Sequence, residues 1–429
     1  MLNLSERKVF GQLFREERKK RKWIMDDVID AKISKSTISR IENGDDSVSE
    51  ETVAYLGSKY GLDLDQMKSD IIATTTEEEL LMMNDRIELG DGENVLVELK
   101  KIKTSQYLDF IYLLTGKIYL YSGDINEAKT YLKKSIKYSK QYAEINSHFN
   151  VYSCAHFILG FIYYNEYQLN KAIELNKIAV DNFDKDGFQL KSLGYILLNR
   201  VAYMDELGRF SKVRKYVEEL DNFCNDFDCP EISCGRYIYK GKFSILEERF
   251  EDAKNEIDKG IRLAVTNKLV DHYLELYCLL GDLCVSQKKL KVAEKWYKHG
   301  LSIEAKCKRI EGIIEGYLKL GKLYLHNDRE KAMKQISTAI ERCENENYSG
   351  AHYIDALMLS GDFHFHNQDY ATAKLPYEKA MDIALKHQLE GKKKVLSLKL
   401  SACCEDDLKK KIYYLTMFQE LSLQEGSLI

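Results

Sequence analysis

The segment from Ile33 to Gly44 gathers side chains that could bind an anionic partner rich in hydrogen-bonding groups. Ile38 and Ile41 are spaced as on the inward face of a short helix. The outward side chains are Lys35, Ser36, Thr37, Ser39 and Arg40. Hydroxyl groups can bond to base edges, and ammonium and guanidinium groups pair with phosphates. The segment therefore predicts a surface suited to nucleic acid.

A small helical domain is needed to position this segment. Ser34 is a natural N-cap and Asn43-Gly44 a natural C-terminal stop, so the segment forms a helix of about eight residues. Apolar periodicity predicts four more short helices, the first with Val9, Phe10, Leu13 and Phe14 on one stripe. They are expected at residues 6–20, 25–31, 50–60 and from 63 onward, where Asp63 and Gln66 resemble a capping box. The five helices predict a domain of residues 1–73.

The charge of this domain is uneven. From Arg7 to Arg40 there are eleven Lys or Arg against five Asp or Glu, and from Ile41 to Asp70 two against eight. The net charge of the whole chain is only −4. Such asymmetry inside one small domain favours a surface that faces nucleic acid, with solvated helix charge as the alternative.

The string from Ser34 to Gly44 resembles the third helix of the helix-turn-helix domains of the phage-repressor (Xre, Cro/C1-type) family. The resemblance implies that this helix lies in the major groove of DNA. It assigns DNA contacts to Lys35, Ser36, Thr37 and Arg40, and a phosphate contact to Ser39. A domain used only for protein contact is the alternative.

One departure from that family concerns the second helix. Family members open it with Thr-Gln or Ser-Gln, which touches the DNA backbone, whereas Ile24-Met25 stands here and the segment is one residue short. Arg15, Arg18 and the basic run at residues 19–22 are expected to supply phosphate contacts instead.

A repeated pattern fills most of the remaining chain. A small residue recurs at intervals that settle at 40 residues, and a second follows each about twelve positions later. The first series is Gly116, Gly160, Val201, Gly241, Gly281, Gly321 and Gly361, and the second is Ala128, Ala172, Val213, Ala253, Ala293, Ala332 and Ala373. Small side chains at both points let two helices lie close together. The pattern resembles the tetratricopeptide repeat, lengthened by about six residues.

The composition favours an all-α fold. Pro230 and Pro376 are the only prolines among 429 residues, and proline is the strongest helix breaker. We expect a helix-turn-helix domain at 1–73, a helical linker at 74–104, a right-handed tetratricopeptide-like helical solenoid of about seven repeats at 105–392, and C-terminal capping and dimerisation helices at 393–429. The sequence has neither an apolar run long enough to span a membrane nor a signal sequence, so a soluble cytoplasmic protein is expected.

The expected linker is itself helical. Thr76 is expected to cap a helix at 77–89, and Gly90-Asp91-Gly92 to form a turn before a second helix at 95–102. A stiff connection of this kind could transmit motion from the repeats to the N-terminal domain.

The first helix of each repeat is expected to line a concave groove. The residues placed there are Lys117, Tyr121, Phe161, Tyr164, Asn165, Asn199, Tyr239 and Lys242, followed by Asp282, Lys322 and Asp362. Amides can pair with the backbone of an extended peptide while aromatic side chains receive its side chains. The groove therefore predicts a peptide site, with packing between repeats as the alternative for the tyrosines. Asn199 interrupts an apolar helix, where an amide is costly without a partner or water.

Metal, redox and catalytic chemistry are not favoured. The ten cysteines are expected to be buried thiols. Cys224, Cys229 and Cys234 are five residues apart, unlike the ligands of zinc knuckles. His364 and His366 point to different sides of a helix. We expect no metal, no cofactor and no enzyme activity.

A repressor-type domain followed by such a solenoid resembles the RNPP group of Gram-positive regulators (Rap, Rgg, NprR, PlcR), and NprR most of all. The resemblance implies a quorum-sensing transcription regulator that binds an inverted-repeat DNA operator as a homodimer and is switched by a short signalling peptide. It implies a groove asparagine on the peptide backbone, a role that falls on Asn199 and then Asn165, and dimerisation through the repeats and residues 396–423. Two alternatives stay open: a Rap-like or NprR-like module that binds a response regulator through residues 77–102, and a phage lysis–lysogeny regulator.

Overall fold

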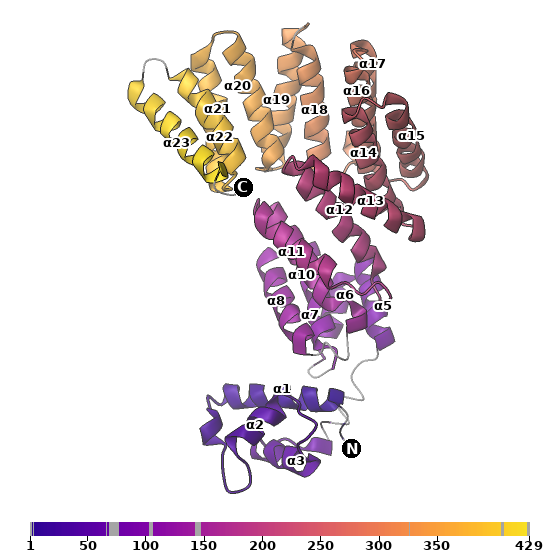
Figure 1. Ribbon diagram of the computed structural model, residues 1–429, viewed down its shortest axis with the longest axis vertical. Coiled ribbons are helices and arrows are strands. Elements are labelled where there is room, and N and C mark those ends of the chain that lie inside the picture. The colour runs from indigo at the N-terminus through magenta and orange to yellow at the C-terminus, as the bar shows by residue number, and fades with distance from the viewer. Residues whose placement is uncertain are drawn as a thin grey trace. The chain divides into compact units, whose positions relative to one another are not determined.

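The computed structural model describes the chain except residues 1, 3, 66, 68–76, 103–105, 142–146, 326, 405–406 and 427–429. Its described residues form α-helices and a few 3-10 turns and contain no strand, which confirms the all-α fold (Figure 1). The chain divides into two compact units. The N-terminal unit comprises Met1–Asn165 with Leu169–Ile196, and the C-terminal unit comprises Glu166–Gln168 with Leu197–Ile429.

The N-terminal unit begins with a small helical domain, the head, made of described residues 2–67. Its elements are α1 (Leu4–Lys20), η1 (Met25–Asp27), α2 (Lys35–Glu42) and α3 (Glu50–Lys59). Phe10, Phe14, Ile38, Leu56 and Tyr60 form the centre of its core, each at most 2% exposed. The bounds of α2 agree with the sequence prediction, because Ser34 Oγ accepts a hydrogen bond from Thr37 N–H and Gly44 takes the left-handed conformation, with φ at +74°.

The expected helix at 25–31 is wrong, since only the single 3-10 turn Met25–Asp27 forms there. Asp30 explains the early end, because its carboxylate accepts the backbone N–H groups of Lys32 and Ile33. A short acid that bonds to nearby backbone N–H groups competes with helix formation. The capping box predicted at Asp63 and Gln66 falls partly outside the described residues, which omit Gln66.

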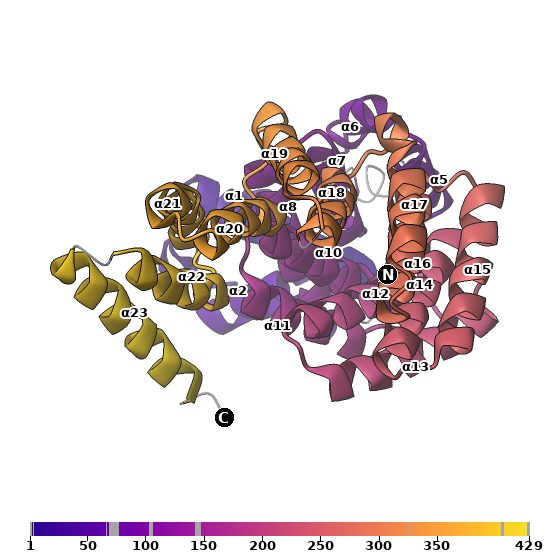
Figure 2. The ribbon, with the colours of Figure 1, turned by 90° about the horizontal axis from the view of Figure 1, so that it is seen from above.

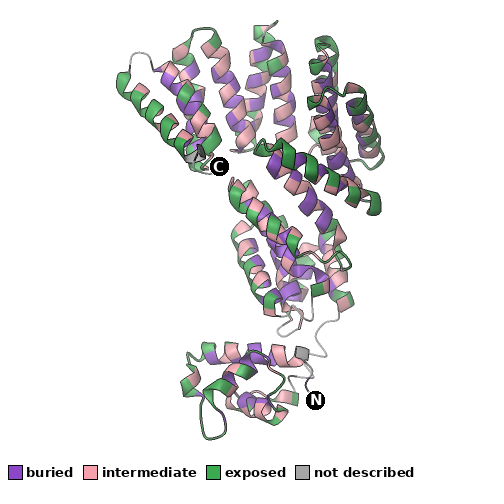
Figure 3. Cartoon of the chain, in the orientation of Figure 1, coloured by how far each residue is buried: buried purple, intermediate pink, exposed green. Residues whose placement is uncertain are grey.

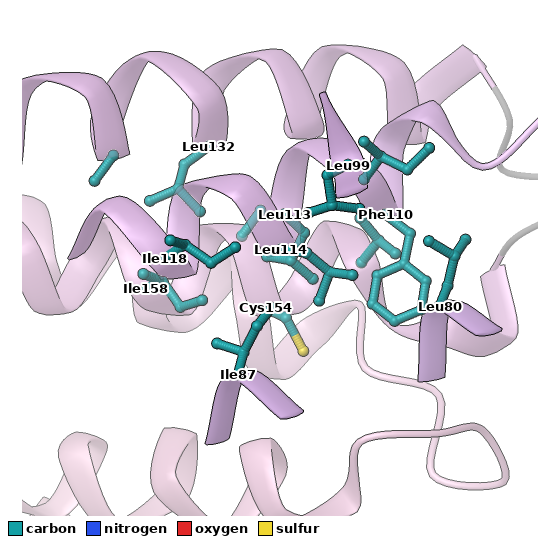
Figure 4. Close-up of a cluster of buried hydrophobic side chains, with 14 of the residues drawn as sticks. Leu80, Ile87, Leu99, Phe110, Leu113, Leu114, Ile118, Leu132, Cys154 and Ile158 are labelled. Carbon is teal, nitrogen blue, oxygen red and sulfur yellow. The ribbon is translucent and has the colours of Figure 1, made fainter. Parts of the chain in front are cut away.

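Helices α5 (Glu77–Glu88) and α6 (Gly92–Leu99) occupy the expected linker. The predicted cap Thr76 lies outside the described residues. Both helices bury apolar side chains against α7 (Leu108–Tyr121): Leu80, Ile87 and Leu99 join Phe110 in one core cluster (Figure 4). This helix pair is therefore part of the repeat core rather than a free connection.

The rest of the N-terminal unit stacks helical hairpins. Its elements are α7, α8 (Ile125–Gln141), η2 (Ser147–Phe149), α10 (Val151–Asn165), α11 (Leu169–Asp181) and the first turns of α12 (Leu190–Glu206). Helices α7 and α8 pair extensively, as do α10 and α11.

The C-terminal unit continues the hairpin pattern from the later turns of α12. Its helices are α13 (Phe210–Asp226), α14 (Pro230–Leu246), α15 (Phe250–Thr266), α16 (Val270–Ser286), α17 (Leu290–Leu301), α18 (Ile310–Tyr324), α19 (Arg329–Asn345), α20 (Ala351–His366), α21 (Tyr370–Lys386), α22 (Glu390–Cys403) and α23 (Leu408–Gly426), with the turn η3 (Glu304–Lys306) before α18. Figure 2 shows α20 beside α21 and α22 beside α23, and these pairs are in contact. Pro230 occupies the first turn of α14, where a missing N–H costs nothing.

The small residues do what their spacing predicts. A Cβ atom at Gly281 would lie 2.1 Å from the Tyr297 ring, and one at Gly361 would lie 2.3 Å from the Tyr377 ring. Gly116 faces Leu132 in the same way. Each pair joins the first helix of a repeat to the second helix, four residues after its small residue. Burial is concentrated along these facing sides (Figure 3).

Candidate functional site

The outward face of α2 presents the residues predicted to contact DNA. Lys35, Ser36 and Arg40 are exposed, and Thr37 and Ser39 are half-buried. All five therefore lie on one short helix whose opposite face, Ile38 and Ile41, is buried in the head.

Two ion pairs tether the cations of this face. Lys35 Nζ lies 2.9 Å from Asp26 Oδ1, and Arg40 Nε lies 2.9 Å from Asp45 Oδ2. Hydrogen bonds from Ser47 and then from Arg40 hold the pKa of Asp45 well below its usual range. Exposed pairs of this kind contribute about 0–1 kcal/mol. A DNA phosphate could therefore take the place of either carboxylate at little cost.

Arg18 does not face solvent as the sequence analysis expects. Its guanidinium is buried and donates two hydrogen bonds to the fully buried Glu42 carboxylate and one to Trp23 C=O. The hydrogen bond to Glu42 raises the pKa of Arg18 above its usual value. Arg15 also donates to Glu42, at 3.1 Å, and to Asn43 Oδ1, at 2.6 Å. Both arginines join α1 to α2, and the committed, buried Arg18 is unsuited to a phosphate contact.

The basic run that follows α1 is better placed for phosphates. Lys19, Lys20 and Lys22 are exposed. Arg21 donates to Tyr60 C=O and lies over the Trp23 ring, 5.1 Å from its centroid. The three lysines leave a cationic edge beside α1.

The N-terminal unit contains five of the residues predicted to line the groove. Lys117 is buried, and its ammonium donates to Asn84 Oδ1 at 2.8 Å and to Glu88 Oε1 at 2.5 Å. Tyr121 also donates weakly to Glu88. The other three are Phe161 and Asn165, which are exposed, and Tyr164, which is half-buried. Lys117 is therefore occupied by α5, a contact that the sequence analysis missed because it assigned α5 to a linker.

The C-terminal unit contains the remaining three. The Asn199 amide donates to the Tyr203 hydroxyl at 3.4 Å, one helical turn away, and is only partly buried. Burial raises the pKa of Tyr203. Tyr239 is half-buried, and Lys242 Nζ lies 2.5 Å from Asp205 Oδ2. Asn199 thus keeps amide capacity for a further partner, because its single protein bond is long.

A braced charge network in the C-terminal unit is a further feature that sequence reasoning missed. Asp282 accepts hydrogen bonds from the Tyr297 hydroxyl at 2.7 Å and from Lys319 Nζ at 2.6 Å. Burial alone would lower the pKa of Lys319, but Glu315 and Asp282 outweigh it and raise that pKa.

The same network recurs 80 residues along the chain, where Asp362 accepts from Tyr377 and Lys399. Asp282 and Asp362, both predicted groove residues, therefore brace neighbouring helices. A Gly-Asp pair followed fifteen residues later by Tyr is the sequence signal that could have revealed it.

Comparison with protein families supports both parts of the chain. Residues 9–69 match the model described as a helix-turn-helix domain, and residues 111–142 and 274–307 match the tetratricopeptide repeat. The chain joins a helix-turn-helix domain to tetratricopeptide repeats. Both predictions are confirmed. No curated protein matches the chain in sequence.

Solved structures share this architecture at low sequence identity. The apo form of the quorum sensor NprR from B. thuringiensis has a TM-score of 0.53 and 15% identity, covering 86% of this chain and 99% of that one. A Rap protein complexed with competence and sporulation factor has a TM-score of 0.56 and 10% identity, covering 82% and 99%. At such identities the likeness shows a common fold.

Two observations bear on the excluded chemistries. Among the described helices, none is both long enough and apolar enough to cross a membrane. In the same part of the chain, no three His, Cys, Asp or Glu side chains gather so that they could hold a metal ion.

Proposed function

We propose that this protein is a quorum-sensing transcription regulator of the RNPP type, which binds DNA through its head and a short signalling peptide in the groove of its repeats. The observation that carries the proposal is an exposed polar and basic helix, α2, on a helix-turn-helix domain that precedes a repeat stack with the NprR fold. The Rap structure of the same fold is complexed with a factor, which favours a ligand for the repeats here.

The head supplies the DNA contacts in this proposal. Lys35, Ser36, Thr37 and Arg40 reach base edges and phosphates in the major groove, and Ser39 contacts a phosphate. Because one such head binds weakly, the protein acts in the cytoplasm as a homodimer on an inverted repeat. The α22 and α23 helices, with several exposed apolar side chains, are the proposed dimerisation element.

The repeats supply the peptide contacts. Asn199 bonds to the peptide backbone, supported by Tyr239 and Lys242 in its unit and by Asn165, Phe161, Tyr164 and Tyr121 in the other. The role is regulatory and needs no metal, cofactor or catalytic residue. A response regulator is a further partner that the resemblance implies.

Selection of DNA from a random pool, followed by footprinting, tests the proposal. The wild-type protein should enrich an inverted repeat, and the double variant Lys35→Ala/Arg40→Ala should not protect it. Lys254→Ala, which removes an exposed cation from α15 of the C-terminal unit, is the control and should protect it fully. Normal protection by the double variant would contradict the assignment of α2.

A further inference from the structure

Helix α1 has a second buried face that the DNA-binding role does not use. Phe10 and Phe14 point into the core of the head. Val9, Gln12, Leu13 and Glu16 follow the spacing of a separate helical stripe. This stripe contacts α7 and α8 of the first repeat, which lie in the same N-terminal unit.

The contact combines apolar packing with a closed set of hydrogen bonds. Val9 and Tyr138 are buried against each other, at 1% and 6% exposed, and Leu13, Leu108 and Tyr112 surround them. The Tyr138 and Tyr112 rings meet edge-on with centroids 5.2 Å apart. An apolar centre of this kind excludes water from the polar groups beside it.

The polar groups form a triangle. The Gln12 amide donates to the Tyr138 hydroxyl at 2.8 Å and to Glu16 Oε1 at 2.6 Å. The Tyr138 hydroxyl donates to the same Glu16 oxygen at 2.6 Å. Gln12 is buried, whereas Glu16 lies at the exposed rim. A carboxylate acceptor makes the bond from Tyr138 stronger than one between neutral groups.

This docking leaves the DNA-facing helix free. Lys35, Ser36 and Arg40 are exposed, and their bonds are to residues of the head itself. The head is therefore held by its back, through α1, with α2 turned to solvent. A contact that masked α2 would instead block DNA.

We propose that the stripe of Val9, Gln12, Leu13 and Glu16 is a docking surface that fixes the head on the first repeat and makes the protein selective for the spacing of its two DNA half-sites. The proposal rests on the proposed function, because it needs a dimer on an inverted repeat. Two heads on flexible tethers would accept many spacings, whereas two docked heads are separated by a distance that the repeat domains set.

Two variants of the full-length protein and one control test the docking. Glu16→Lys replaces the acceptor by an ammonium near Lys137, whose own Nζ lies 5.5 Å from the Tyr138 ring centroid. Tyr138→Phe removes the shared hydroxyl. Tyr131→Phe is the control, since Tyr131 belongs to the neighbouring ring cluster with Tyr112 and Tyr119 and has no recorded contact with the head.

The first measurement is small-angle X-ray scattering without DNA. Glu16→Lys should broaden the distribution of interatomic distances, Tyr138→Phe should do so less, and Tyr131→Phe should match the wild type. If Glu16→Lys leaves the distribution unchanged, the docking does not hold in solution and the proposal is overturned. This readout does not depend on DNA binding.

The second measurement compares operators whose half-sites have native spacing or are moved about five base pairs apart, half a turn of DNA. The wild type should lose at least about tenfold in affinity on the altered spacing, and Glu16→Lys about threefold or less, with equal affinities for one half-site. Equal spacing selectivity in both proteins overturns the proposed role in spacing. Absence of all DNA binding by the wild type would overturn the proposed function, while the scattering would still decide the docking.

Discussion

Arg18 and Glu42 form a two-pronged ion pair inside the head. Arg18 Nε lies 2.7 Å from one carboxylate oxygen of Glu42, and Nη2 lies 2.9 Å from the other. The pair joins α1 to the end of α2, the helix that the proposal places in the major groove. The position of the DNA-facing residues therefore depends on a contact that touches no DNA.

Replacing Glu42 with Gln should destabilise the head by about 3 kcal/mol, since it leaves a buried guanidinium without its counter-charge. Denaturant unfolding followed by the fluorescence of Trp23, in a Trp296→Phe background, measures this. Asp26→Asn, which breaks the exposed pair with Lys35, should change the stability by only about 0.5 kcal/mol or less. A loss below about 1 kcal/mol in Glu42→Gln would show that the pair does not brace the head.

Acid should weaken the head through Asp30. Hydrogen bonds from Lys59, then Tyr55 and the backbone of Lys32 hold the pKa of Asp30 well below its usual range. A pKa that is lower in the folded state means that the stabilisation is complete above the unfolded value, about pH 4, and is lost as the pH falls below it.

Thermal unfolding of Asp30→Asn checks this pH dependence. The variant should be less stable than the wild type at neutral pH, and the difference should shrink below about pH 4. Asp46→Asn is the control, because Asp46 is exposed and has no recorded hydrogen bond within the described part of the head. A difference between Asp30→Asn and the wild type that is constant with pH would refute this role.

A methyl group at Gly281 should disrupt the repeat that contains it. The new Cβ would lie 2.1 Å from the Tyr297 ring, so the helices must separate, at a cost of about 1–3 kcal/mol. Circular dichroism during thermal unfolding measures the loss. Gly391→Ala, where the nearest space is open, should be neutral or slightly stabilising. Equal stability of the two variants would mean that close helix approach at Gly281 is not required.

Peptide affinity should depend on Asn199. Asn199→Ala removes an amide that would replace water on the peptide backbone, at a cost of about 1–3 kcal/mol, or roughly tenfold or more in affinity. Calorimetry with synthetic peptides from a small reading frame downstream of the gene measures this. Asn267→Ala, an exposed change at the end of α15, should bind normally. Unchanged affinity in Asn199→Ala would place the peptide elsewhere.

The same variant separates the two sites. Asn199→Ala should keep normal DNA binding while losing the response to peptide, since a ligand shifts an equilibrium only by its differential affinity for the two states. Operator binding with and without peptide is the measurement. A full peptide response in the variant would sink the role of Asn199 in switching.

Local signals explain which features the sequence could predict. The bounds of α2 follow from Ser34 and Gly44, and the helix pairs follow from small residues such as Gly281, because caps and close approaches leave marks at fixed positions. Long-range partners leave no such mark. Arg18 meets Glu42 across 24 residues, and Lys117 meets Glu88 across 29, so both were predicted as free side chains.

The stripe on α1 shows the same limit. Val9 and Leu13 lie next to Phe10 and Phe14 in sequence, so the apolar pattern predicts one buried face for all four. The structure divides them between two surfaces, since Val9 packs on Tyr138 and the two phenylalanines fill the head. Periodicity reveals that a helix is buried but not against what.

The recurrence of the braced network after 80 residues bears on how this chain could have grown. Deleting a single repeat of 40 residues would bring Leu359 to the place of Lys319, and Asp282 would lose its ammonium partner. Deleting two repeats would bring Lys399 to that place and keep the pair. In this half of the protein the heritable building block is therefore a double repeat, and duplications or losses that respect it are the ones that selection can retain.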